Sequence, residues 1–135
     1  MNSIFKECGK GQYVEKIKWK YQGHTYGMVD VKMKCSGEFF YRFPAIGNPD
    51  GEWNWEMNCR EKGFKYLRGR EESWPGIVNV EARCVEGEKD LSSNDDMRGE
   101  YNRDLVCHFP GTKVVGLQVK QKTHHGLINF RVYCG

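Results

Sequence analysis

The chain has 135 residues, about the length of one domain, and its hydrophobic content of 39% excludes a disordered chain. Its 21 basic and 18 acidic residues are interspersed and leave a net charge of +3, which argues against a nucleic acid partner. The apolar runs fall far short of the ~20 residues that span a bilayer. No hydrophobic signal region follows Met1, so either the protein is cytosolic or a signal segment has been removed.

We expect the chain to fold into β-strands, because no segment carries a 3.6-residue apolar repeat long enough for a helix. In chain order, the strands are expected at residues 13–21, 28–35, 38–43, 52–57, 63–69, 77–84, 99–107, 112–120 and 127–134. Residues 22–26 and 70–75 are expected as polar turns, and 44–51 as a loop rich in Pro, Gly and Asn.

One nine-residue segment occurs three times and sets the expected architecture. The copies span 27–35, 76–84 and 126–134, each with a Gly, two apolar residues, an Asp or Asn, a bulky apolar residue and a final Cys. We expect a four-stranded antiparallel sheet used three times, its apolar faces closing into a triangular prism with pseudo-threefold symmetry. The repeats cover roughly 1–50, 51–98 and 99–135 of a single domain, 1–135. The first repeat looks incomplete, because only seven residues precede Cys8.

The six cysteines form three consecutive pairs whose partners are 27, 25 and 27 positions apart. The expected disulfides are Cys8–Cys35, Cys59–Cys84 and Cys107–Cys134. Each pair brackets one predicted turn, so we expect each disulfide to tie the open end of its own hairpin. Zinc binding is the alternative, but it favours close pairs such as Cys-x-x-Cys, which the chain lacks. Disulfides favour an oxidising compartment, and we therefore expect a secreted, extracellular protein.

The repeated segment ending at Cys134, preceded by Gly-Leu-Gln-Val-Lys at 116–120, resembles the repeat of the vitelline membrane outer layer proteins. Trp53, six residues before Cys59, is similar to the strand aromatics of that family. The resemblance implies a secreted, disulfide-bonded, all-β protein with the β-prism I fold, built from three four-stranded Greek-key sheets. The turns differ, however, because this chain lacks the Asp-Asp-Thr-Ala-type turn of that family.

Jacalin-related lectins share the β-prism I fold, and their hairpins are similar to those expected here. In those lectins an Asp after the turn and neighbouring backbone amides hold sugar hydroxyls. The resemblance implies a carbohydrate-binding set at the matching positions, namely Tyr26, Asp30, Trp74, Asn79, His125 and Asn129. The glycine-rich companion loop of the lectins corresponds to 45–51 and 92–99, neither of which is a Gly-Gly loop.

Each of these residues also has a purely structural interpretation. Asp and Asn beside a Gly are favoured at turns, where they cap the local backbone. Trp53 and Trp55 lie two residues apart on one strand face and are either core residues or an exposed tip. Three histidines lie in the predicted turns: His24, His124 and His125. We expect their side chains to be solvated and not to form a metal site, because no acidic partner recurs at a fixed spacing.

The chain carries no recognisable catalytic motif, and we expect no enzymatic activity, cofactor or metal. Glu52 and Glu56, with Asp50 nearby, resemble a glycosidase carboxylate pair only in residue type. The function expected is non-catalytic, lectin-like binding of glycans or glycoproteins by the loops at one end of the prism. The alternatives are a structural protein of an extracellular matrix, such as an egg coat or shell, and a lipid-targeting module. A homo-oligomer is compatible with each.

Overall fold

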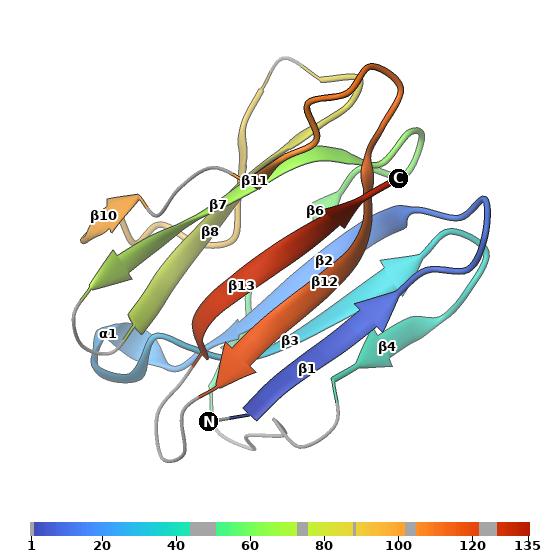
Figure 1. Ribbon diagram of the computed structural model, residues 1–135. Helices are drawn as coiled ribbons and strands as arrows, with labels where there is room; N and C mark the ends of the chain where they lie inside the picture. The colour runs from blue at the N-terminus through green and yellow to red at the C-terminus, as the bar shows by residue number, and fades with distance from the viewer. Residues whose placement is uncertain (1, 44–50, 73–75, 88, 102–104, 122–126) are drawn as a thin grey trace.

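The computed structural model describes residues 2–43, 51–72, 76–87, 89–101, 105–121 and 127–135 (Figure 1). Its strands are β1 (Asn2–Glu7), β2 (Val14–Tyr21), β3 (Met28–Cys35), β4 (Phe40–Arg42), β5 (Glu52–Trp53), β6 (Met57–Asn58), β7 (Phe64–Glu72), β8 (Gly76–Cys84), β9 (Leu91–Ser92), β10 (Glu100–Tyr101), β11 (Leu105–Val106), β12 (Val114–Gln121) and β13 (Leu127–Cys134). The single turn of helix α1 (Gly23–Tyr26) replaces the turn expected between β2 and β3. In the described part of the chain, no helix has the length and apolar character to cross a membrane.

The strands form three antiparallel sheets, so the all-β class is confirmed. The first sheet has the order β4-β3-β2-β5, with β6 also paired to β2. The second sheet has the order β10-β7-β8-β9, with β11 also paired to β7. The third sheet has the order β1-β12-β13, so among the described residues it has three strands where four were expected. Each sheet is therefore organised around one hairpin, β2–β3, β7–β8 or β12–β13, as the repeat predicts.

The N-terminal strand completes the sheet formed by the C-terminal hairpin. β1 pairs with β12 over its full length, from Asn2 opposite Gln121 to Glu7 opposite Gly116. It takes the place that β5 and β6 take beside β2, and that β10 and β11 take beside β7. The seven residues before Cys8 thus suffice for a strand, which corrects the expectation of an incomplete first repeat.

The three disulfides have the predicted pairing, but they join different sheets. Cys8 follows β1 of the third sheet, whereas Cys35 ends β3 of the first sheet. The residue that faces Cys35 across its own hairpin is Val14. Cys59–Cys84 joins the first sheet to the second, and Cys107–Cys134 joins the second to the third. The expectation that each bond closes its own hairpin is therefore wrong, and the disulfides link the sheets in a ring.

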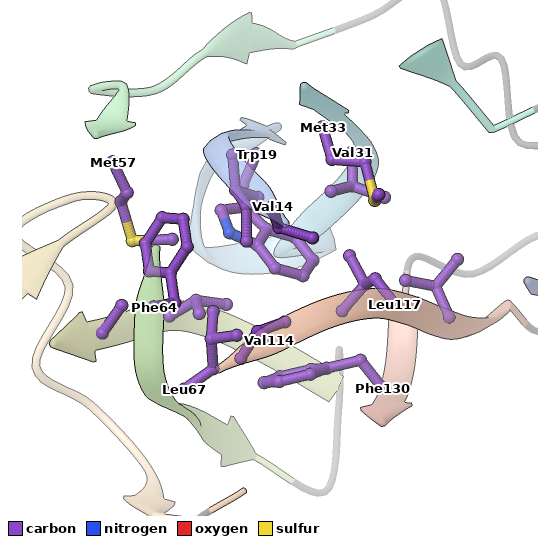
Figure 2. Packing of buried hydrophobic residues seen from close by; sticks show 14 of the residues in the cluster. Val14, Trp19, Val31, Met33, Met57, Phe64, Leu67, Val114, Leu117 and Phe130 are labelled. Carbon is purple, nitrogen blue, oxygen red and sulfur yellow. The ribbon is translucent and has the colours of Figure 1, made fainter. Parts of the chain in front are cut away.

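One hydrophobic cluster contains residues from all three sheets (Figure 2). At its centre the Trp19 ring lies 5.4 Å from the Phe130 ring, measured between centroids. Gly69 and Val119 occupy the register position of Trp19 in the other two hairpins. The large indole of the first sheet therefore corresponds to a glycine in the second, a difference in size that suits close packing of a shared core.

The tryptophans of the segment between β5 and β6 lie outside this core. Trp55 is 59% exposed, and Trp53 is half-buried against lysines on the outer face of the first sheet. The chain leaves the strand at Asn54, whose N–H donates to the Trp19 carbonyl oxygen, so the two-residue alternation ends there. The interpretation of Trp53 and Trp55 as core residues is therefore wrong.

Candidate functional site

The repeated Asp or Asn of each hairpin lies where the strand register shifts. Lys20 faces Asp30 while the next residue, Tyr21, faces Met28, and the other two hairpins shift at the same place. Such a shift is a β-bulge, which leaves one residue without a partner on the opposite strand. The Asp30 Oδ1 atom accepts a hydrogen bond of 2.7 Å from the N–H of the next residue, and Asn129 makes the same contact at 2.8 Å. The repeated position therefore has a structural role in the bulge.

In the second sheet this residue also holds a neighbouring loop. The Asn79 Nδ2 atom donates to the carbonyl oxygens of Asp96 at 3.0 Å and Asn94 at 3.3 Å. Its Oδ1 atom accepts a hydrogen bond of 2.7 Å from the Ser93 hydroxyl. Asn79 itself is fully buried. Its amide thus fixes the conformation of residues 92–98, which we call the 92–98 loop.

The 92–98 loop lies against the first sheet. The Tyr21 hydroxyl, at the end of β2, donates a hydrogen bond of 2.6 Å to the Asp96 carboxylate. The Asn94 Nδ2 atom donates to the Asn54 side-chain oxygen at 3.0 Å. The backbone N–H of Trp55 donates to the Ser93 carbonyl oxygen. These contacts form a site at the junction of two repeats, next to the hairpin end of β2.

A glycine ends this loop because the backbone allows nothing larger. Gly99 has φ +82°, and a Cβ atom there would lie 2.3 Å from the Glu71 carbonyl oxygen. The Arg70 guanidinium donates to the Met97 carbonyl oxygen at 3.0 Å. The loop is therefore held at both ends by β7 and β8.

The Asp96 carboxylate is the electrostatic centre of the site. Its side chain is 4% exposed and accepts hydrogen bonds from Arg98 at 2.8 and 2.9 Å, besides the bond from Tyr21. The Arg98 guanidinium holds the pKa of this carboxyl well below its usual range, and the Tyr21 hydroxyl adds to the effect. Burial, together with the bond to Asp96, raises the pKa of Tyr21 to about 12. At neutral pH the site therefore holds a carboxylate, a neutral phenol and a guanidinium.

A hollow of about 570 Å³ opens at this point, lined by Tyr21, Asn94, Asp95, Asp96, Met97 and Arg98. The Arg98 side chain is 48% exposed, and Met97 is 60% exposed. The hollow therefore offers guanidinium donors, carboxylate and amide groups, and an apolar thioether. Such a combination suits a ligand that presents both hydroxyl groups and C–H surface.

The predicted binding residues occupy different environments. Tyr26, on α1, is 49% exposed, and Asn129 is also exposed. Asp30 and Asn79 are fully buried. Neither side chain is exposed to a ligand, so each can affect binding only through the backbone segment that it stabilises. Trp74, His125 and most of the 45–51 loop lie outside the described residues.

The residues that sequence reasoning missed are Tyr21, Asn94, Asp96 and Arg98. Only the polar character of 92–99 and its match to a lectin loop pointed toward this region. The partnership of Tyr21 with Asp96 spans 75 positions of sequence and has no local signature.

The metal alternative involves three histidines whose side chains, those of His24, His124 and His125, lie outside the described part of the chain. Among the residues that are described, no group of three or more His, Cys, Asp or Glu is placed to hold a metal ion. Of the carboxylates considered for catalysis, Glu56 forms an ion pair of 3.7 Å with Lys16, and Asp50 is outside the described residues.

No protein-family model matches the sequence, and no curated protein matches it. The fold is similar to the crystal structure of a prostate-specific glycoprotein lectin, WGA16, in its form II. The TM-score is 0.76 with 12% sequence identity, over 98% of this chain and 89% of the lectin chain. At this identity the likeness shows the fold alone, which this chain shares with a lectin.

Proposed function

We propose that the protein is a secreted, non-catalytic, lectin-like protein of the β-prism I fold that binds glycans in the hollow beside the 92–98 loop. The observation that carries the proposal is the joint between Tyr21 and Asp96, which fixes polar and apolar groups around a hollow of about 570 Å³. The fold shared with a lectin supports it, and the three disulfides agree with an extracellular location.

Different residues have different roles in this proposal. Arg98 and Asp95, both exposed, contact sugar hydroxyls as donor and acceptor, and the exposed Met97 contacts the C–H face of the ring. Asp96 is fully engaged by Arg98 and Tyr21, so it positions the guanidinium instead of meeting the ligand. Asn79 holds the loop from below.

The hairpin ends of the other repeats provide further contacts in the proposal. Tyr26 and Asn129 are exposed and available to a ligand, and we retain Trp74 and His125 as contact residues on the sequence pattern. Asp30 acts through its bulge, as Asn79 acts through its loop. Several weak contacts on one molecule give avidity on a glycan-rich surface without tight binding at any single place.

A structural role in an extracellular matrix is the second candidate, favoured by exposed aromatic side chains that do not line the hollow. Phe39 is 95% exposed and Phe109 is 79% exposed, in the turns that follow Cys35 and Cys107. Exposed aromatic rings of this kind mark contact surfaces for other macromolecules. Retention on matrix stripped of its glycans would favour this candidate over sugar binding.

A glycan array tests the proposal. The wild-type protein is expected to bind at least one glycan class on the array, and soluble glycan of that class is expected to compete. The absence of any bound glycan, with a folded protein confirmed by circular dichroism, would overturn the carbohydrate-binding function.

A further inference from the structure

The outer face of the first sheet carries five lysines on its two central strands. We call Lys16, Lys18, Lys20, Lys32 and Lys34 the lysine face. They alternate with core residues such as Ile17, Trp19 and Met33, so their side chains lie on the face away from the core. The strand register sets Lys16 opposite Lys34 and Lys18 opposite Lys32. Like charges directly opposite on neighbouring strands repel, so each of these pairs is destabilising unless nearby carboxylates compensate it.

The second sheet shows the same framework with its charge balanced. Arg68 and Arg70 occupy the positions of Lys18 and Lys20, and Tyr101 occupies that of Trp53. The position of Lys32 is filled by Glu81, which accepts hydrogen bonds of 2.9 Å from Arg68 and 3.4 Å from Arg70. The Tyr101 hydroxyl also donates to this carboxylate, at 3.0 Å. One carboxylate therefore organises two arginines and an aromatic ring.

In the first sheet the central carboxylate is replaced by a lysine. The Lys32 Nζ atom lies 4.4 Å from the centroid of the Trp53 ring and 5.3 Å from that of Phe40. Glu15 and Glu56 form ion pairs with Lys34 and Lys16 at the end of the face nearer the cysteines. Among the described residues, none forms an ion pair with Lys18.

We infer that the lysine face binds an acidic polysaccharide, whose sulfate or carboxylate groups meet Lys18 and Lys32 where the second sheet has Glu81. Neighbouring strands lie about 4.8 Å apart and alternate residues about 6.8 Å apart, so Lys16, Lys18, Lys32 and Lys34 are regularly spaced in a way that suits a chain with repeated anions. Lys20, which is 7% exposed, is largely covered. The Trp53 and Phe40 rings lie beside the lysines and can contact sugar C–H groups. The choice of a glycan as carrier of the anions rests on the proposed carbohydrate-binding function, although the face is separate from the hollow.

Binding to immobilised dextran sulfate, with neutral dextran as the reference, tests this inference. The wild-type protein is expected to bind dextran sulfate with an affinity that falls as salt rises, and to show no binding of dextran by this face. Lys32→Glu introduces the residue type of Glu81, its equivalent in the second sheet. Lys18→Gln introduces the residue type of Gln118, its equivalent in the third sheet. Each is expected to weaken binding about ten-fold or more, as for loss of a charged contact.

The matched control is Arg131→Glu, which makes the same charge change at the register position of Lys32 in the third sheet. It is expected to change the affinity by about two-fold or less, because screening limits the effect of distant charges. An equal loss in Arg131→Glu and Lys32→Glu would overturn the inference, since net charge alone would then account for binding. Equal binding of dextran and dextran sulfate would overturn it as well.

Two further measurements distinguish the lysine face from a lipid-binding surface and from the hollow. Vesicles containing phosphatidylserine are expected to bind weakly, and vesicle binding through the same lysines without dextran sulfate binding would assign the face to lipid. The Arg98→Ala variant is expected to retain dextran sulfate binding. Dextran sulfate binding that depends on the lysines, in a protein that binds no glycan through the hollow, would reject the loop site and retain this one.

Discussion

The hydroxyl of Tyr21 donates a hydrogen bond of 2.6 Å to the carboxylate of Asp96 and so joins the first hairpin to the 92–98 loop. Asp96 is nearly buried and is also held by Arg98, so the three side chains form one unit. The hollow beside them exists because two different repeats meet there.

Removal of this joint should destabilise the protein. Tyr21→Phe leaves the carboxylate without one of its donors, and we expect a loss of about 1–2 kcal/mol in the free energy of unfolding. The measurement is urea unfolding at neutral pH. Tyr13→Phe is the control, because the Tyr13 hydroxyl donates to the neutral Arg60 carbonyl oxygen at 2.7 Å, and we expect about 1 kcal/mol or less there. A Tyr21→Phe variant as stable as the wild type would show that the joint contributes nothing.

The same pair predicts a defined pH window of stability. The pKa of Asp96 is lowered in the folded protein, so its contribution is present above the ordinary carboxyl pKa of 3.8 and is lost as the pH falls. The pKa of Tyr21 is raised from 10.0 to about 12, so its contribution is complete below pH 10.0 and is lost as the pH rises toward 12. Urea unfolding across the alkaline range should show this loss in the wild type and a smaller one in Tyr21→Phe. Identical alkaline profiles would contradict the assignment.

The disulfide ring makes a prediction about where each bond acts. Replacement of Cys8 and Cys35 by Ala should cost about 2–4 kcal/mol of unfolding free energy. Because Cys8 follows β1, amide exchange should increase most in β1 and in its partner β12. Exchange that increases only within the β2–β3 hairpin would instead fit a bond that staples that hairpin alone.

Replacement of the buried Asn79 should destabilise the protein more than replacement of the exposed Asn129. Asn79→Ala removes the contacts to Ser93, Asn94 and Asp96 and should cost about 2–3 kcal/mol, because it leaves buried polar groups unpaired. Asn129→Ala, at an exposed position, should cost about 1 kcal/mol or less. Thermal unfolding of both variants checks this order, and equal losses would mean that the 92–98 loop does not depend on Asn79.

The hairpins could be predicted from the sequence because their pattern is local. Ile17 and Trp19 alternate with lysines, and the structure buries the first two in the core. The repeat likewise located the three returning strands. The all-β class follows from these periodicities, whereas the short β5 and β6 could not be separated, since the break at Asn54 depends on contacts with other segments.

The inter-sheet links could not be predicted from spacing. Cys8 and Cys35 have the same separation whether Cys8 lies on the hairpin or on a strand that pairs elsewhere. Only the pairing of β1 with β12, at opposite ends of the chain, distinguishes the two. The same limit applies to the site, where the sequence pattern of Asp30 and Asn79 predicted ligand contacts but not that both side chains are fully buried and hydrogen-bonded within a bulge and a loop.

Glycan affinity of the Arg98→Ala variant tests the proposed site most directly. Arg98 is 48% exposed and contacts Asp96, while Arg83 is 41% exposed and contacts Asp90 at 3.0 Å on the outer face of the second sheet, so Arg83→Ala is the matched control. With the best ligand from the array, titration calorimetry should show about ten-fold weaker binding for Arg98→Ala and unchanged binding for Arg83→Ala. Unchanged binding in Arg98→Ala, or an equal loss in both variants, would contradict a glycan site beside the 92–98 loop.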